Sequence, residues 1–438
     1  MNRSIPAIGL ALAAGAAALT LSLGQFGDVQ ASREERSRFS VDASWPKALP
    51  NQWLVGQVGG IAVDRHDNIW IIQRAFSLTD DEAGAESRFP VNPALAATRT
   101  VVRSDCCKAA PAVLKFNRAG DLLAAWGGPA DPGFLTSRCV AIPETPRPAG
   151  SDISIRDDKN SCDWPVANEH GIFVDHNDFV YIGGNGGANN QVLKFTADGT
   201  FVYQIGRPGA FSSATHGRSN NKDGDRNGRP LLGQPADTEV DPVTNELYIA
   251  DGYQNKRVVV VDAATGKYKR HWGAYGSAPI DPVSALPAYE PNAKPDSQFR
   301  NPVHCVRVAK DGLVYVCDRV NNRYQVFTKG GQFIDEVLYA RDTLGNGAMW
   351  DVDFSAGKRQ KYLYNPDGEN QRVAIFDRRS GDLVSTFGRN GRSAGQFHWV
   401  HNLAVDSKGN IYTAEVDTGK RAQKFKPRDD DDDDHDRD

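Results

Sequence analysis

The sequence has no excess of charge of one sign. Its 51 Lys and Arg residues face 55 Asp and Glu residues, and the tail from Arg428 to Asp438 alone contributes 2 minus 8, or −6, so the rest of the chain lies near +2. Without a basic field there is little attraction for a phosphate backbone, and we expect no nucleic-acid partner. The tail, residues 428–438, is typical of an acidic, disordered segment that keeps a protein soluble.

Long helices are also disfavoured, because 42 glycines and 24 prolines fit many turns better. The long apolar run from Ile5 to Leu23 follows Arg3 and ends before a small-residue cleavage site at Val29-Gln30-Ala31. This pattern predicts a signal peptide over residues 1–31 and an exported protein, periplasmic or secreted. The run is long enough to span a bilayer, so an uncleaved anchor is the alternative, and only then do we expect membrane contact.

Cysteine is scarce, and no cysteine follows the leader as a lipoprotein would require. The six cysteines allow up to three disulfides in an exported protein. Pairing among the four that lie in two predicted insertions would fix two long loops; these are Cys106, Cys107, Cys139 and Cys162. Cys305 and Cys317 face each other across a predicted hairpin, where they either pair or remain buried thiols.

What the chain does contain is a repeat. Two short β-branched runs, at 303–308 and 314–318, flank an Asp-Gly turn and predict a hairpin. Related units recur six times, starting near residues 59, 170, 236, 304, 350 and 401. Apart from the first interval, which contains the long insertions, a recurrence of about 45 to 65 residues with three or four strands per unit is typical of propeller blades.

We therefore predict an all-β, six-bladed β-propeller over residues 32–427. Its long loop insertions should lie in the first blade, at 75–112, and between blades one and two, at 129–165. Such insertions are suited to form a lid or a docking surface. The segment 39–42 precedes the first unit, so we expect it to supply the outer strand of the last blade and leave no exposed edge there.

The first strand of every blade lines the central channel, so equivalent residues of different blades meet around one axis. The equivalent positions of blades one to six are Gly59, His170, Ala236, His304, Trp350 and His401. One histidine at a strand mouth would be explained by a hydrogen bond to the backbone, but three on alternate blades lie about 120° apart at one depth. This arrangement predicts a Zn²⁺ site with a fourth position open, as in catalytic zinc centres.

At these residues the chain resembles the peptidyl-α-hydroxyglycine α-amidating lyase (peptidylamidoglycolate lyase) family, whose core is a six-bladed NHL-type propeller. The resemblance covers most of residues 40–426. The segments that carry it are 54–64 with 71–74, the three histidine phrases and 250–258.

The resemblance implies roles for individual residues. His170, His304 and His401 match the family's zinc ligands, while Arg74 and Tyr253 match its catalytic arginine and tyrosine. Ile61 and Ile172 match the backbone donors of a structural Ca²⁺, and Asn402 stands where the family has an aspartate ligand. Trp399 replaces a methionine, so we assign Trp399 and Trp350 to a substrate pocket of altered shape. Gln254 replaces a cysteine, so at least one family disulfide is missing.

The predicted activity is that of a zinc-dependent carbon–nitrogen lyase, which cleaves a carbinolamide to an amide and glyoxylate. Arg74 suits the substrate carboxylate because a guanidinium binds it through two parallel hydrogen bonds, and Tyr253 suits the role of proton acceptor. We expect a monomer acting on a small-molecule or peptide substrate. The alternatives are a non-enzymatic binding or scaffold propeller of the cell envelope, and a calcium-dependent sugar-lactonase-like hydrolase, which would need a carboxylate-rich metal site.

Overall fold

The computed structural model describes residues 38–85, 102, 104–131, 139–141, 162–166, 168–209, 230–280 and 286–428. Within these ranges the regular structure is β, apart from two 3-10 turns, η1 (Ala75–Ser77) and η4 (Ala274–Gly276). No helix in this part of the chain has the length and apolarity needed to cross a membrane. The predicted leader, 1–31, and residues 429–438 of the predicted tail lie outside the described residues.

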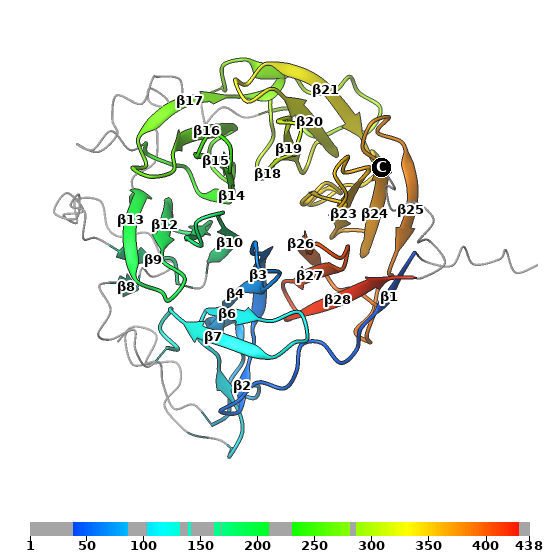
Figure 1. The fold of residues 1–438 in the computed structure, drawn as a ribbon. Helices are drawn as coiled ribbons and strands as arrows, with labels where there is room; N and C mark the ends of the chain where they lie inside the picture. The colour runs from blue at the N-terminus through cyan, green and yellow to red at the C-terminus, as the bar shows by residue number, and fades with distance from the viewer. Residues whose placement is uncertain are drawn as a thin grey trace, which may run out of the picture. The chain divides into compact units, whose positions relative to one another are not determined.

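Six four-stranded antiparallel sheets surround a central channel, in chain order from blue to red (Figure 1). Blades one and two consist of β3 (Gln57–Val63), β4 (Ile69–Arg74), β6 (Val113–Phe116) and β7 (Leu122–Trp126), then β10 (Glu169–Val174), β11 (Val180–Gly184), β12 (Gln191–Phe195) and β13 (Phe201–Gly206). Blades three and four consist of β14 (Pro235–Asp241), β15 (Glu246–Asp251), β16 (Arg257–Asp262) and β17 (Tyr268–Trp272), then β18 (Val303–Val308), β19 (Val314–Asp318), β20 (Arg323–Phe327) and β21 (Phe333–Leu338). Blades five and six consist of β22 (Asp353–Phe354), β23 (Tyr362–Asp367), β24 (Arg372–Asp377) and β25 (Leu383–Phe387), then β26 (Val400–Val405), β27 (Ile411–Glu415), β28 (Arg421–Pro427) and β1 (Phe39–Val41). The predicted six-bladed β-propeller is confirmed.

The N-terminal strand completes the last blade, as the sequence predicted. β1 pairs antiparallel with β28, with Phe39 opposite Pro427 and Val41 opposite Phe425. The two ends of the described chain therefore lie in one sheet (Figure 1). This pairing covers the edge that β28 would otherwise expose, and it ties the ring closed with strand hydrogen bonds.

An aspartate at the end of the inner strand forms the tight turn of several blades. Asp64 Oδ1 accepts hydrogen bonds from the backbone N–H groups of His66 and Asn68, both at 2.9 Å. The same side chain accepts the indole N–H of Trp70 at 2.9 Å. Short Asx side chains stabilise such turns because they replace a backbone acceptor. In the blades that have it, this Asp thus fixes where the inner strand stops and the next strand starts.

Aromatic side chains fill the space between neighbouring sheets. Between blades one and two, Trp126 lies 5.2 Å from Phe195 and 6.5 Å from Trp164, measured between ring centroids. Trp164 is fully buried and belongs to β9 (Cys162–Trp164), which pairs in parallel with β8 (Cys139–Ala141). Part of the second predicted insertion is therefore built into the core between two blades.

All six cysteines are paired. The disulfides are Cys106–Cys107, Cys139–Cys162 and Cys305–Cys317. The last bridge joins directly opposed residues of β18 and β19. The first insertion also contributes a short parallel pair, β2 (Trp53–Leu54) with β5 (Lys108–Ala109). Three disulfides fit an exported protein, because reducing compartments keep thiols free.

Blade five differs from the predicted repeat at its inner strand, which contains only two residues. The backbone of Trp350 does not enter the ladder, because its N–H donates to Asn365 Oδ1 and its carbonyl accepts from His304 Nδ1. The backbone N–H and C=O of Trp350 thus form hydrogen bonds with side chains instead of with a neighbouring strand.

Candidate metal centre in the channel

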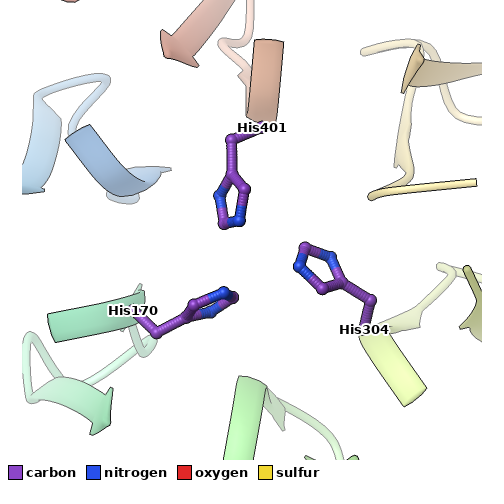
Figure 2. A group of neighbouring side chains, drawn as sticks. All are labelled: His170, His304 and His401. Carbon is purple, nitrogen blue, oxygen red and sulfur yellow. The ribbon is translucent and has the colours of Figure 1, made fainter. Parts of the chain in front are cut away.

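The three predicted histidines meet at the centre of the ring. His170, His304 and His401 project inward from β10, β18 and β26, and their imidazoles face one another (Figure 2). All three are buried, and each offers a nitrogen within 4.8 Å of those of the other two. This span is somewhat wider than the separation of about 3 to 4 Å that a filled tetrahedral zinc site requires and that the sequence led us to expect. In the described residues it is the one group of three or more His, Cys, Asp or Glu side chains that can hold a metal ion.

Hydrogen bonds on the outer side orient each imidazole. The Nδ1 partners are the Ala236 carbonyl at 2.6 Å for His170, the Trp350 carbonyl for His304, and Asn402 Oδ1 for His401. Each acceptor is an oxygen, so each Nδ1 must carry the proton and each Nε2 presents its lone pair to the channel. Such outer contacts fix both tautomer and ring direction in histidine metal sites.

The protein holds these imidazoles neutral. Burial, reinforced by the charges of His401 and Arg74, lowers the pKa of His170 well below its usual value. Burial and the Arg319 guanidinium do the same to the pKa of His304. Burial, with Arg74 and Arg319, lowers the pKa of His401 to about 3. Neutral imidazoles are the form that binds a metal, so this site keeps its ligands ready at any pH near neutrality.

The Tyr253 side chain extends from blade three to the three histidines. Its hydroxyl lies 3.0 Å from His170 Nε2 and 3.1 Å from His304 Nε2. The ring stands edge-on to His170, with centroids 5.2 Å apart. The structure therefore brings the predicted tyrosine to the face of the histidines that a metal would occupy.

Two arginines stand on opposite sides of the channel. Arg74, from blade one, donates from Nε to the Glu169 carbonyl at 2.8 Å and from Nη1 to Gln57 Oε1 at 2.9 Å. Arg319, from blade four, lies 3.3 Å from the Tyr253 hydroxyl through Nη1. Blades one and four face each other in a ring of six, so the guanidinium groups flank the histidine site.

The sequence analysis did not identify Arg319, although this residue has the same position in its blade as Arg74. Gln73 pairs with Val58 in blade one, and Asp318 pairs with Val303 in blade four, so these positions are equivalent. Arg74 and Arg319 each follow directly. The Arg319 side chain is buried, its Nε has no hydrogen-bond partner, and the ion pairs of the described residues include none for it. A buried cation without a counter-ion is costly, and an anionic ligand would relieve that cost.

Two indoles form the wall between His304 and His401. Trp350 is 1% exposed and contacts both histidine rings, at centroid distances of 5.8 and 5.6 Å. The Arg319 guanidinium lies 4.5 Å from the Trp350 ring centroid, and Trp399 packs on the same ring perpendicularly at 5.4 Å. Trp350 is thus enclosed, whereas Trp399 is half-buried and forms the outer part of the wall.

The residues assigned to a structural Ca²⁺ do not form a suitable donor set. Ile61 and Ile172, which would offer only backbone carbonyls, lie in paired inner strands of blades one and two. The Asn402 side chain is already used, because its Oδ1 contacts His401 Nδ1 and its Nδ2 donates to Asp351 Oδ2 at 3.2 Å. No carboxylate belongs to this set, and calcium sites are rich in carboxylates. We therefore derive no step through calcium.

A cation of the protein's own is buried beside this region. Arg307 of β18 pairs through Nη1 with Asp237, through Nη2 with Asp351 at 3.0 Å, and through Nε with Glu239 at 3.8 Å. With Asp353, these form the channel carboxylate cluster: Asp237, Glu239, Asp351 and Asp353. Burial raises the pKa of all four, to about 6 for Asp237 and Asp353 and about 8 for Glu239, against the opposing charge of Arg307. Arg307 thus links the inner strands of blades three, four and five.

The raised pKa of Glu239 makes stability pH-dependent. The folded protein favours the neutral form of the Glu239 carboxyl, whereas in the unfolded chain this carboxyl ionises above about pH 4.5. The free energy that Glu239 costs the folded state therefore grows from pH 4.5 to about pH 8. We expect Glu239→Gln to raise the free energy of unfolding by about 1 to 3 kcal/mol at pH 8 and by little at pH 4.5. Urea unfolding at both pH values measures this effect.

Exposed Glu290 supplies the matched control, since Glu290→Gln removes a carboxylate that has no such burial. An equal gain at both pH values, or a loss at pH 8, would contradict the assignment of Glu239 as a neutral group.

By sequence, the chain is similar to amidating monooxygenases, while no family model matches. The chain is 26% identical over 192 residues to peptidyl-glycine alpha-amidating monooxygenase B of Xenopus laevis, which is 42% of this chain and 19% of that protein. It is also 26% identical over 191 residues to the peptidyl-glycine alpha-amidating monooxygenase of Mus musculus, covering 42% and 17%. The match spans less than one fifth of the length of these relatives.

Among solved structures, streptogramin B lyase aligns with 89% of this chain and 98% of its own, with a TM-score of 0.44 and 11% identity. The nidogen/laminin complex aligns with 79% of this chain and 84% of its own, with a TM-score of 0.40 and 11% identity. The sequence matches thus establish a distant similarity to amidating monooxygenases over 42% of this chain.

Proposed function

We propose that this protein is a metal-dependent carbon–nitrogen lyase, which converts a carbinolamide, R-CO-NH-CH(OH)-COO⁻, to an amide and glyoxylate. The observation that carries the proposal is the convergence of three Nε2 lone pairs, the Tyr253 hydroxyl and the Arg319 guanidinium at one channel mouth. The distant similarity to amidating monooxygenases supports the same class of substrate.

Three neutral, outwardly anchored imidazoles fit a zinc ion. Zinc accepts nitrogen ligands in tetrahedral geometry, and three protein ligands leave one position for substrate. When bound, zinc would supply Lewis acidity that lowers the pKa of a hydroxyl group presented to it. His170, His304 and His401 would hold it.

Tyr253 is placed to move the proton. The substrate hydroxyl gives up its proton, the carbon–oxygen bond becomes the aldehyde C=O, the carbon–nitrogen bond breaks, and its electron pair goes to nitrogen, which is protonated. Tyr253, in its phenolate form, accepts the first proton and returns it to the leaving nitrogen, so it ends as the phenolate again and no other reactant is consumed. Its hydroxyl lies 3.0 and 3.1 Å from the Nε2 atoms of His170 and His304, so a substrate hydroxyl held beside these nitrogens would lie close to it.

The two arginines are placed to orient the substrate carboxylate. Arg319 has an unpartnered Nε and stacks on Trp350, so its guanidinium plane is fixed without being neutralised. Arg74 is held by Glu169 and Gln57 on the opposite side. A guanidinium binds a carboxylate through two parallel bonds, which fixes the direction of the reacting carbon.

The test is glyoxylate release from α-hydroxyhippurate by the zinc-loaded protein. We expect Arg74→Lys and Arg319→Lys each to lower kcat/KM by about 30- to 1000-fold, equal to about 2 to 4 kcal/mol, because lysine keeps the charge but loses the paired hydrogen bonds. The zinc content of both variants should equal that of the wild type, since neither residue is a ligand.

Exposed Arg65, in blade one, gives the control Arg65→Lys, which should leave kcat/KM unchanged. If only one of the two site variants is slow, that arginine alone holds the carboxylate. If the zinc-loaded wild type releases no glyoxylate from any α-hydroxyglycine compound, a binding propeller becomes the better account. The lactonase alternative lacks a carboxylate-rich metal site within the described residues.

We also propose that the protein acts outside the cytoplasm, as a monomer. Its three disulfides agree with an oxidising compartment.

A further inference from the structure

The disulfide between the adjacent residues Cys106 and Cys107 is a bridge that the stability of the fold does not explain. A disulfide stabilises a protein chiefly by constraining the unfolded chain, and it does so more when it closes a longer loop. The Cys139–Cys162 and Cys305–Cys317 bridges join residues 23 and 12 positions apart, whereas Cys106 and Cys107 are one position apart. A bridge between neighbours constrains the unfolded chain very little.

This bridge is also the one that solvent reaches most readily. Cys106 is exposed and Cys107 is half-buried. Each of the other two bridges contains at least one enclosed residue, since Cys162, Cys305 and Cys317 are at most 1% exposed. Exchange requires an attacking thiolate to reach one sulfur, and accessible disulfides are the labile and regulatory ones. An external thiol can therefore attack Cys106 Sγ without the opening of a blade.

The chain that follows the bridge supports the residue before Arg74. β5 begins directly after Cys107 and pairs in parallel with β2. The Ala110 carbonyl accepts a hydrogen bond from Gln73 Nε2 at 2.7 Å, and Gln73 Oε1 accepts one from the Gly56 N–H at 2.8 Å. The buried Gln73 amide thus ties the end of the first insertion to the segment that enters blade one.

Arg74 is held by the same segment. Arg74 Nη1 donates to Gln57 Oε1 at 2.9 Å, and the Gln57 N–H donates to Ser77 Oγ at 2.7 Å. Ser77 Oγ in turn donates to the Arg74 carbonyl at 2.7 Å. A change in residues 106–110 would therefore reach the guanidinium through a continuous set of hydrogen bonds.

We propose that the Cys106–Cys107 bridge is a redox site that exchanges with small dithiols, and that its oxidation state sets how firmly Arg74 is held. A thiolate of the dithiol attacks Cys106 Sγ, the sulfur–sulfur bond breaks, and Cys107 leaves as a thiolate that takes a proton. The second thiol then closes the disulfide of the reagent and releases Cys106, which is protonated in turn. Two electrons and two protons thus pass from the dithiol to the protein.

The first experiment treats the full chain with dithiothreitol, stops samples with iodoacetamide and maps the alkylated cysteines by peptide mass spectrometry. Cys106 and Cys107 should be alkylated at least about tenfold faster than the other four cysteines, because exchange rates depend on access. Those four serve as the control within each sample. Equal rates for the three bridges, or a slower rate for this one, overturn the redox site.

The second experiment removes the bridge in the double variant Cys106→Ser and Cys107→Ser, without any reductant. Its urea midpoint should equal that of the wild type, because the bridge closes no long loop. Amide hydrogen exchange should become faster in residues 52–57 and 73–78 and stay unchanged in β20. Affinity for hippurate, a carboxylate without the reacting hydroxyl, should fall by about three- to tenfold in calorimetric titration, because Arg74 is less well oriented.

Exposed Asp105 gives the matched control, since Asp105→Asn changes the same turn but keeps the bridge, and it should leave all three measurements unchanged. A lowered urea midpoint, or hydrogen exchange like that of the wild type in both segments, overturns the link to Arg74. The exchange itself does not depend on the proposed lyase activity; only the effect on hippurate rests on that proposal. Fast alkylation and faster hydrogen exchange, in a protein that releases no glyoxylate, overturn the lyase and support the redox site.

Discussion

Replacing His304 with alanine is expected to remove the metal and abolish activity. Two nitrogens would remain of the three that converge in the channel, and the Tyr253 hydroxyl would lose one of its two imidazole partners. We expect the zinc content to fall from about one to below about 0.1 per chain, and kcat/KM to fall by at least about 1000-fold, since catalytic zinc requires three protein ligands. Metal analysis by mass spectrometry and glyoxylate release measure the two effects.

A matched control lies close by in blade six. His398 is half-buried and stands outside the metal group, so His398→Ala should keep both zinc and activity. The His304→Ala protein should stay folded, because the variant loses two hydrogen bonds, to the Trp350 carbonyl and to the Tyr253 hydroxyl, at a cost of about 1 kcal/mol each. Full zinc content in a folded His304→Ala protein would contradict the metal centre.

Replacing Arg307 with methionine is expected to destabilise the fold strongly. The variant keeps most of the side-chain volume but leaves the channel carboxylate cluster buried without its cation. Breaking a buried pair by removing one partner costs about 3 to 5 kcal/mol, because the remaining charge is uncompensated. Urea unfolding at pH 8 should show a loss of this size.

The sign of the pH dependence follows from the raised carboxyl pKa values. As the pH falls below about 6, Asp237 and Asp353 become neutral in the fold, so the cost of losing Arg307 should shrink toward pH 5. Arg65→Met, which breaks an exposed pair with Asp178, should leave the free energy of unfolding nearly unchanged. Adding Glu239→Gln to Arg307→Met should restore part of the loss. A loss below about 1 kcal/mol for Arg307→Met would show that the cluster does not depend on this arginine.

Arg307 and Arg319 are both buried, but their surroundings differ, and so do their roles. Arg307 is surrounded by carboxylates and holds three blades together. Arg319 is buried beside neutral histidines and two aromatic rings, and its Nε is unpartnered. A buried charge without a counter-ion destabilises the fold. Such a charge is typical of a site where a bound ligand supplies the opposite charge. The first arginine is structural, and the second points to an anionic substrate.

The sequence by itself determined the architecture and the metal group. Repeated strand patterns and turns specify sheets of one kind, and residues in one register on inner strands must meet on the axis when the ring closes. The positions of His170, His304 and His401 on alternate blades therefore needed no contact information. The pairing of β1 with β28 followed from the same logic, since an uncompleted blade exposes an edge.

The tertiary structure alone decided how the side chains around that group are used. Disulfide connectivity depends on Cα separation, which six cysteines in three segments leave open. Asn402 was expected to serve an ion, but its amide bridges His401 and Asp351, because a short side chain serves whichever partners lie within about 3 Å. Arg319 and Arg307 come from one blade and both lie buried near the axis, yet one meets carboxylates and the other does not. That difference depends on what the neighbouring blades present at each depth, and a single strand pattern does not encode it.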